Sequence, residues 1–183
     1  MTNKILFLSP LFTIVILLVL HSHAEEMEAL FEKARIQPIK GEQMAPNFSL
    51  ENIDGKKISL RQYRGMIVFL NFWATWCGPC KEEMPSMEAL HQKFKGDQFI
   101  FFAISVDYEE KKKVKEFIDK HRYTFPVLTD PKGLTLDLYK VKGIPATILI
   151  DKKGRIIGRA IGPRDWNHTD IHTLLKVLLE RKQ

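Results

Sequence analysis

Cysteine is scarce in this chain of 183 residues: there are only two, and both lie in the run Trp76-Cys77-Gly78-Pro79-Cys80. The lack of a second Cys pair argues against a structural zinc site, because such sites usually need four protein ligands. It also excludes a fold held together by several disulfides, and a loop this short would remove very little unfolded-state entropy if it were closed. Chemistry therefore explains the pair better than stability does.

Concentrated basic tracts, internal repeats and low-complexity segments are also missing. The formal net charge is +6, but the basic residues are scattered in small groups such as Lys56-Lys57, Lys111–Lys113 and Lys152-Lys153. Proteins that bind nucleic acid typically carry a basic stripe within a recognisable motif. The scattered pattern is typical of solvated turns and helix faces, so we expect no nucleic-acid partner.

The N-terminus begins with an apolar stretch from Ile5 to Leu20 that follows the single charge of Lys4, a pattern typical of an export signal. Ser22-His23-Ala24 places small residues where a signal peptidase cuts, which favours cleavage after Ala24. The stretch is only a little shorter than the roughly 20 residues of a spanning helix, so an uncleaved membrane anchor through residues 5–20 is the alternative. Both interpretations predict a location in the periplasm or on the extracytoplasmic face of the membrane.

Without residues 1–24 the chain has 159 residues, which is enough for one compact domain and too few for two. Within residues 25–40, apolar side chains at helical spacing predict a short helix, and Gln37-Pro38 then predicts a linker. Residues 41–183 are expected to form the single domain, and we expect a monomer.

The domain alternates between buried-strand and helical patterns. Ile67 to Trp73 is a continuous apolar run with one Asn, typical of a strand covered on both faces, and helical spacing follows up to Phe94. Further elements are expected as hairpins at Phe48–Leu60 and Ala146–Ile161, strands at Phe99–Val106 and Phe125–Leu128, and helices at 109–120, Leu134–Tyr139 and about Asp165–Arg181. This order predicts an α/β fold with a mixed sheet and helices on both faces.

The Cys motif falls at a strand-to-helix junction of this pattern. Cys77 lies at the mouth of the helix, where unpaired backbone N–H groups and the helix dipole favour a thiolate, and Pro79 fits the first turn. Cys80 lies one turn further on the same face and is less accessible. We therefore predict that Cys77, with an exposed sulfur, attacks a disulfide and that Cys80 resolves the mixed disulfide, which leaves an oxidised Cys77–Cys80 pair.

The run from Phe72 to Pro85 resembles the active-site segment of membrane-facing thioredoxin-like proteins of the TlpA, ResA and CcmG type, and the resemblance extends over Gly41 to Lys182. It implies a thioredoxin-like fold with an N-terminal β-hairpin and a central βα extension. It also implies a thiol-disulfide oxidoreductase that needs no cofactor. Such an enzyme takes electrons from a membrane thiol-disulfide donor and reduces disulfides in exported client proteins, of which apocytochrome c is the best-known example. Gly78-Pro79 is also the thioredoxin dipeptide, which favours a reductant.

The same resemblance suggests residues for the substrate side of the site. The proline that matches Pro145 is cis and packs against the cysteines in these proteins, and the backbone of the preceding residue, here Ile144, pairs with bound peptide. Trp76 matches an aromatic residue that covers the cysteines, whereas Phe72 and Trp73 resemble core residues.

The resemblance also suggests an acid–base group. Glu83 matches an acidic residue that tunes cysteine protonation, and the alternative is a surface glutamate on a charged helix face. Asn71 stands where thioredoxin has a buried acid. Since an amide cannot exchange a proton, Glu83 is the better candidate for acid–base work.

Two other function classes are weaker alternatives. Peroxidases of the peroxiredoxin class share the Ala45-Pro46-x-Phe48 opening, but they place Thr three residues before the reactive Cys, whereas Thr75 lies two before Cys77. A metal-binding module would have only two thiolates, and His168 and His172 are better explained as separate surface histidines. We expect no metal.

Overall fold

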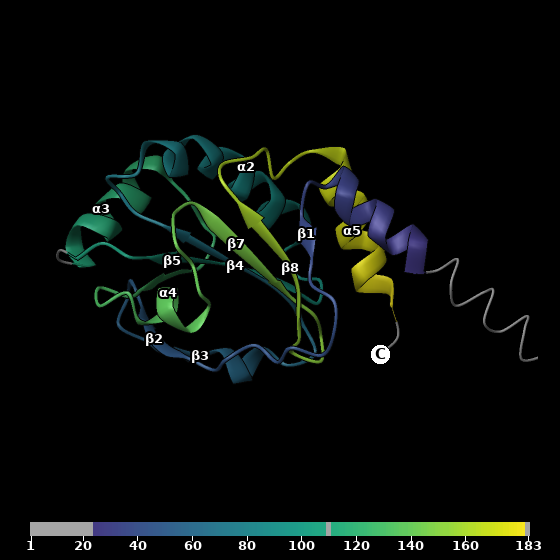
Figure 1. Ribbon diagram of the computed structural model, residues 1–183. Coiled ribbons are helices and arrows are strands. Elements are labelled where there is room, and N and C mark those ends of the chain that lie inside the picture. Colours follow the sequence, from purple (N-terminus) through teal and green to yellow (C-terminus); the bar gives the residue numbers. More distant parts are fainter. Residues whose placement is uncertain (1–23, 109–110, 182–183) are drawn as a thin grey trace, which may run out of the picture.

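The computed structural model describes residues 24–108 and 111–181, and within them eight strands form one mixed sheet (Figure 1). In chain order the strands are β1 (Gln37–Pro38), β2 (Ser49–Asn52), β3 (Lys57–Ser59), β4 (Ile67–Trp73), β5 (Phe99–Ser105), β6 (Val127–Thr129), β7 (Ala146–Ile150) and β8 (Ile156–Ile161). Their order across the sheet is β1-β8-β7-β4-β5-β6-β2-β3. The neighbours β4, β5 and β6 are parallel and the other pairs are antiparallel. The predicted mixed α/β sheet is confirmed.

The described helices precede, connect and follow these strands. They are a helix over residues 24–33, a 3₁₀ helix η1 (Leu60–Tyr63), and the α-helices α2 (Gly78–Phe94), α3 (Lys111–His121), α4 (Leu134–Leu138) and α5 (Thr169–Glu180). The hairpin expected near the N-terminus is β2–β3.

Each face of the sheet has its own apolar core. Alternate residues of β4 point to opposite sides, so Phe69 packs with α2, α3, α5 and the helix 24–33, while Leu70 packs with α4, η1 and the segment before β2. All the longer helices therefore cover one face. Helices do lie on both faces, as predicted, but the second face carries only short ones.

Residues 25–40 do not form the predicted linker. The helix is confirmed, but Gln37 and Pro38 form β1 and pair with Arg159 and Gly158 of β8. Gly158 leaves room for the side chains that precede this strand, because a Cβ there would lie 2.8 Å from the ring of Phe31 and 2.9 Å from Ile36. The linker prediction is wrong for these two residues. Proline lacks a backbone N–H and usually interrupts a strand, but it is tolerated in a strand at the edge of a sheet, which is where β1 lies.

The last helix also begins later than expected. Asp165 was predicted to open it, whereas α5 starts at Thr169 and His168 is its N-cap, with Nδ1 accepting from the N–H of Asp170 at 3.3 Å. Trp166 is fully buried instead of lying on the helix. Among the described residues no helix is long and apolar enough to cross a membrane, and the predicted export signal or anchor lies almost wholly outside them.

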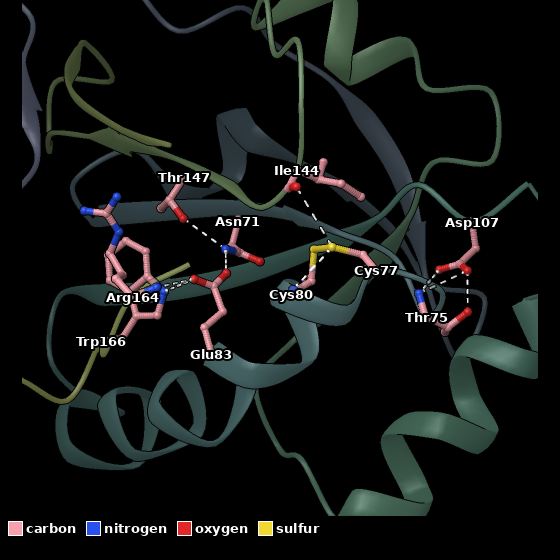
Figure 2. The surroundings of a disulfide bond; sticks show 10 residues. All are labelled: Asn71, Thr75, Cys77, Cys80, Glu83, Asp107, Ile144, Thr147, Arg164 and Trp166. Atoms are coloured by element: carbon pink, nitrogen blue, oxygen red, sulfur yellow. Dashed lines mark hydrogen bonds between the residues drawn. A yellow bond between two sulfur atoms is a disulfide. The ribbon is translucent and has the colours of Figure 1, made fainter. Parts of the chain in front are cut away.

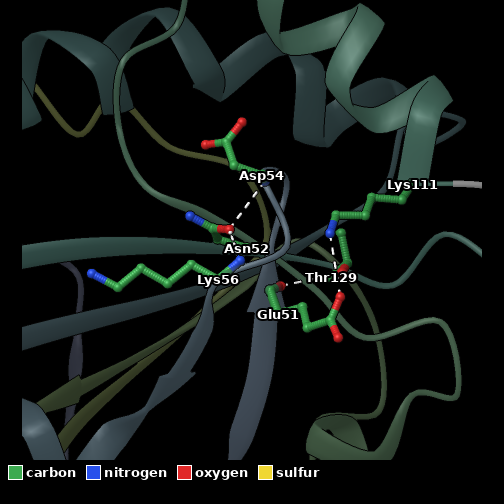
Figure 3. Close-up of polar contacts among 6 residues, drawn as sticks. All are labelled: Glu51, Asn52, Asp54, Lys56, Lys111 and Thr129. Carbon is green, nitrogen blue, oxygen red and sulfur yellow. Dashed lines mark hydrogen bonds and ion pairs between the residues drawn. The ribbon is translucent and has the colours of Figure 1, made fainter.

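Polar contacts tie the β2–β3 hairpin to the rest of the domain (Figure 3). The Asn52 side chain closes the turn by accepting from the N–H groups of Asp54 and Lys56 at 3.0 and 2.8 Å. Lys111 of α3 pairs with Glu51 at 3.3 Å, and Thr129 of β6 donates to the Glu51 carbonyl at 3.2 Å. The ion pair is partly exposed and contributes little to stability, so the backbone pairing of β2 with β6 does most to hold the hairpin.

Glu88 joins α2 to the segment before β6. Its carboxylate accepts from the Thr124 N–H at 2.7 Å, the Thr124 hydroxyl at 2.6 Å and the Phe125 N–H at 3.3 Å. Burial alone would raise the pKa of Glu88, but these bonds and one from Gln92 outweigh it and lower the pKa. A carboxyl with a lowered pKa stabilises the fold above its ordinary value of 4.5, and this stabilisation is lost as the pH falls through the lowered value.

We expect Glu88→Ala to reduce the free energy of unfolding by about 1–2 kcal/mol at pH 7, because the site is half-buried and the hydrogen bonds are charge-assisted. Urea unfolding at neutral and acidic pH measures this loss, which should shrink as the pH falls below 4.5. Glu82→Ala, on the exposed side of the same helix, is the control and should have little effect. An equal loss in both variants would contradict the assignment.

Candidate active site

Cys77 and Cys80 lie at the junction between β4 and α2, as predicted. Cys77 is the N-cap of α2, Pro79 lies in the first turn, and the Cys77 Sγ accepts from the Cys80 N–H at 3.3 Å. The two sulfurs form a disulfide with an S–S distance of 2.03 Å (Figure 2). The structure therefore shows the oxidised form of the pair.

The two cysteines differ in accessibility, although less than expected. Cys77 is 6% exposed and Cys80 is not exposed at all. The prediction of an exposed Cys77 sulfur is therefore wrong for the oxidised form, because the sulfur is turned toward Cys80 and lies 4.0 Å from the Ile144 carbonyl oxygen. Cys77 is still the more accessible of the two cysteines, as predicted, since Cys80 does not reach the surface.

Of the residues expected on the substrate side, Ile144 has its carbonyl oxygen 4.0 Å from this sulfur. The Ile144–Pro145 peptide bond is cis, as the resemblance implied, and Pro145 is buried while Ile144 is half-buried. Trp76 is 62% exposed beside Cys77, whereas Phe72 and Trp73 are fully buried core residues, as predicted.

Glu83 lies one turn beyond Cys80 and is buried, which excludes the alternative of a surface glutamate. Its Oε1 accepts from Asn71 Nδ2 at 2.7 Å, and its Oε2 accepts from Trp166 Nε1 at 3.1 Å and the Arg164 N–H at 3.2 Å. Burial raises the pKa of Glu83 to about 7, although these bonds and the Arg164 charge act in the opposite direction. The carboxyl can therefore both take up and release a proton near neutral pH.

Several contacts of the site could not be predicted from the sequence. Asn71 Nδ2 also donates to Thr147 Oγ1 at 3.0 Å, so the amide joins α2 to β7. Asp107 is buried and accepts from the Thr75 N–H at 3.0 Å and from the Thr75 hydroxyl at 2.6 Å, which holds the loop before Cys77. These contacts join residues far apart in the chain, so no local sequence pattern predicts them.

The two histidines weighed as metal ligands have separate structural contacts. His168 caps α5, while His172 packs against the ring of Phe94 with centroids 5.7 Å apart. In the part of the chain that the structure describes, no group of three or more His, Cys, Asp or Glu side chains could hold a metal ion.

Comparison with known proteins agrees with this geometry. The model of the AhpC/TSA family matches residues 42–159. The chain is 39% identical to the thiol-disulfide oxidoreductase ResA of Bacillus cereus over 149 residues, which is 80% of this chain and 84% of that protein. It is 45% identical to the thioredoxin-like protein YneN of Bacillus subtilis over 116 residues, 62% of this chain and 67% of that protein.

A solved structure shares the fold as well. A thiol:disulfide interchange protein of the thioredoxin family from Chlorobium tepidum superimposes with a TM-score of 0.68 at 28% identity, covering 77% of this chain and 99% of that one. The fold, the disulfide at the start of α2 and the relatives agree with one another. The chain therefore belongs to the AhpC/TSA family and is a thioredoxin-like thiol-disulfide oxidoreductase similar to ResA.

Proposed function

We propose that this protein is an extracytoplasmic reductase of disulfides in exported client proteins, with apocytochrome c before haem attachment as a candidate client. Its electrons come from a membrane thiol-disulfide donor. The observation that carries the proposal is the Cys77–Cys80 pair at the start of α2, of which only Cys77 reaches the surface. The apolar stretch 5–20 supports export or membrane attachment, and Gly78-Pro79 supports the reducing direction.

The reaction follows from the positions of the two sulfurs. In the reduced protein the Cys77 thiolate, stabilised by the N-terminus of α2, attacks one client sulfur. The client S–S bond breaks, a mixed disulfide forms, and the released client thiolate takes up a proton. Cys80 then loses its proton and attacks Cys77 Sγ, which frees the second client sulfur. Two electrons have passed from the Cys pair to the client, and a donor dithiol later reduces the oxidised pair.

Glu83 is the proposed acid–base group of the second step. Cys80 is not exposed, so its proton cannot pass directly to bulk water. Glu83 is one helical turn away, and its pKa of about 7 suits a group that accepts the proton and later returns it to solvent. On the substrate side, Trp76 lies beside the client segment, and the backbone of Ile144, held by Pro145, pairs with it.

The peroxidase alternative has less support. The Thr75 hydroxyl donates to Asp107 at 2.6 Å, so it is engaged away from the reactive sulfur. A metal-binding role would use the same two sulfurs, which are joined to each other here.

Expressing Cys80→Ala tests the proposed function, because the mixed disulfide can then form but cannot be resolved. We expect disulfide-linked adducts of Cys77 with exported proteins, identified by non-reducing electrophoresis and mass spectrometry, and an almost complete loss of turnover. The double variant Cys77→Ala/Cys80→Ala is the control and should trap nothing. Absence of any adduct that reductant releases would count against the scheme.

A further inference from the structure

Asn71 is a fully buried polar residue of β4, and its amide oxygen has no hydrogen-bond partner among the residues that the structure describes. Buried polar atoms in folded proteins are nearly always hydrogen-bonded, so an unpaired one needs an explanation. The oxygen belongs to the same amide that contacts Glu83, and Figure 2 shows this amide on the side of Glu83 that faces the cysteine pair.

The orientation of this amide is fixed by its nitrogen. Asn71 Nδ2 donates to Glu83 Oε1 at 2.7 Å and to Thr147 Oγ1 at 3.0 Å. Above its pKa of about 7 the Glu83 carboxylate only accepts hydrogen bonds, so turning the amide over would there place its oxygen against another acceptor. The oxygen therefore stays on the side away from Glu83.

That side is where the disulfide lies. Phe69, Asn71 and Trp73 alternate along β4, and Phe69 and Trp73 share with Cys80 the core on the α2 face. Glu83 and Cys80 lie one turn apart on α2. Figure 2 shows the Asn71 nitrogen directed at Glu83 and Thr147 and the oxygen on the side of the sulfurs.

Reduction of the pair creates the missing partner. In the oxidised form Cys80 Sγ carries no hydrogen and cannot donate to Asn71. When a dithiol donor passes two electrons and two protons to the pair, the S–S bond opens, the donor becomes a disulfide and Cys80 becomes a thiol. This S–H group forms at a position with no solvent exposure and needs an acceptor.

We propose that Asn71 Oδ1 accepts a hydrogen bond from the Cys80 thiol in the reduced protein, which makes Asn71 a positioning residue for the resolving cysteine. The inference rests on the dithiol–disulfide cycle of the proposed function. It has two consequences. The bond favours the reduced over the oxidised form, and it keeps Cys80 neutral so that the negative charge stays on Cys77. Two charged groups face this site. Glu83 of α2 accepts from the Asn71 amide, and the charge of Arg164, from the segment before α5, acts on the Glu83 carboxyl.

Asn71→Ala and Asn71→Leu both remove the amide, but the first leaves space and the second fills it, so a change that they share reports lost hydrogen bonds of the amide and not altered packing. We expect the reduced-to-oxidised ratio, measured in glutathione redox buffers, to fall about 3- to 10-fold in both variants. In a Cys77→Ser background the same changes should lower the pKa of Cys80, followed by thiolate absorbance.

Thr147→Val is the matched control, because it removes the other partner of the Asn71 nitrogen and leaves the oxygen in place. Its redox ratio should stay within about twofold of the wild type. If the Asn71 variants do not fold, the infrared S–H stretch of the reduced wild-type protein answers the question, since a hydrogen-bonded thiol absorbs at a lower wavenumber than a free one. A free-thiol frequency for Cys80, or unchanged redox ratios in both Asn71 variants, would overturn the proposal. None of these measurements uses a client, so failure here is distinct from failure of the proposed client or direction.

Discussion

Cys77→Ser is expected to lower disulfide-reductase activity by more than about 1,000-fold, which is the size of effect seen when an enzyme loses its nucleophile. A serine hydroxyl is not ionised near neutral pH, and it cannot form the mixed disulfide on which turnover depends. The initial rate of reduction of a disulfide-containing model protein, with dithiothreitol as electron source, measures the loss.

Cys80→Ser is the comparison for this experiment. It should turn over far more slowly than the wild type. In the absence of dithiothreitol, which would itself reduce the mixed disulfide, the reduced variant should react once with a client to give a stable adduct, because Cys77 remains the accessible sulfur. Adduct formation by Cys77→Ser instead of Cys80→Ser would reverse the two roles. The structure makes that result unexpected, since Cys80 has no exposed surface.

Glu83→Gln should remove a large part of the pH dependence of stability of the oxidised protein. The pKa of Glu83 is raised from 4.5 to about 7 in the folded state, so folding binds a proton between these values. The wild-type protein therefore loses stability as the pH rises from 4.5 to about 7, by about 3 kcal/mol in all, and the contribution is constant outside this window. A glutamine does not titrate and lacks this loss.

Urea unfolding at pH 5 and pH 8 gives the required difference, and Glu82→Gln on the exposed side of α2 is the matched control. The absolute stability of Glu83→Gln is not the readout, because the new amide group meets donors from Asn71 and Trp166 at every pH. The rate of mixed-disulfide resolution should also lose its inflection near pH 7. Parallel stability profiles for the wild type and Glu83→Gln would show that the carboxyl titrates elsewhere.

The sequence predicted those parts of the fold that depend on local patterns of apolar and polar residues. The run Ile67–Trp73 marks β4 from its first to its last residue, because a strand buried on both faces is apolar almost throughout. The position of the Cys pair followed for the same reason, since the strand ends and helical spacing begins on either side of it. β1 was missed because β8 and the close packing at Gly158 define it, and its own two residues do not.

The surroundings of the cysteines depended on contacts between distant segments. Trp166 and Arg164 reach Glu83 across 83 and 81 positions of sequence, and Thr147 reaches Asn71 across 76. Periodicity placed Trp166 within the last helix, whereas packing turned it toward Glu83. The depth of Cys77 was misjudged for the same reason, because the segment around Ile144 lies over it.

The complete burial of Cys80 has a kinetic consequence. Under the proposed function, client and electron donor would each react through the one sulfur of the pair that reaches the surface, that of Cys77, so they would not occupy the protein together. The enzyme then alternates between two half-reactions in a ping-pong order, and an excess of either partner competes with the other for the same atom. Throughput in the cell is therefore governed by the balance between the two partners as well as by the supply of each.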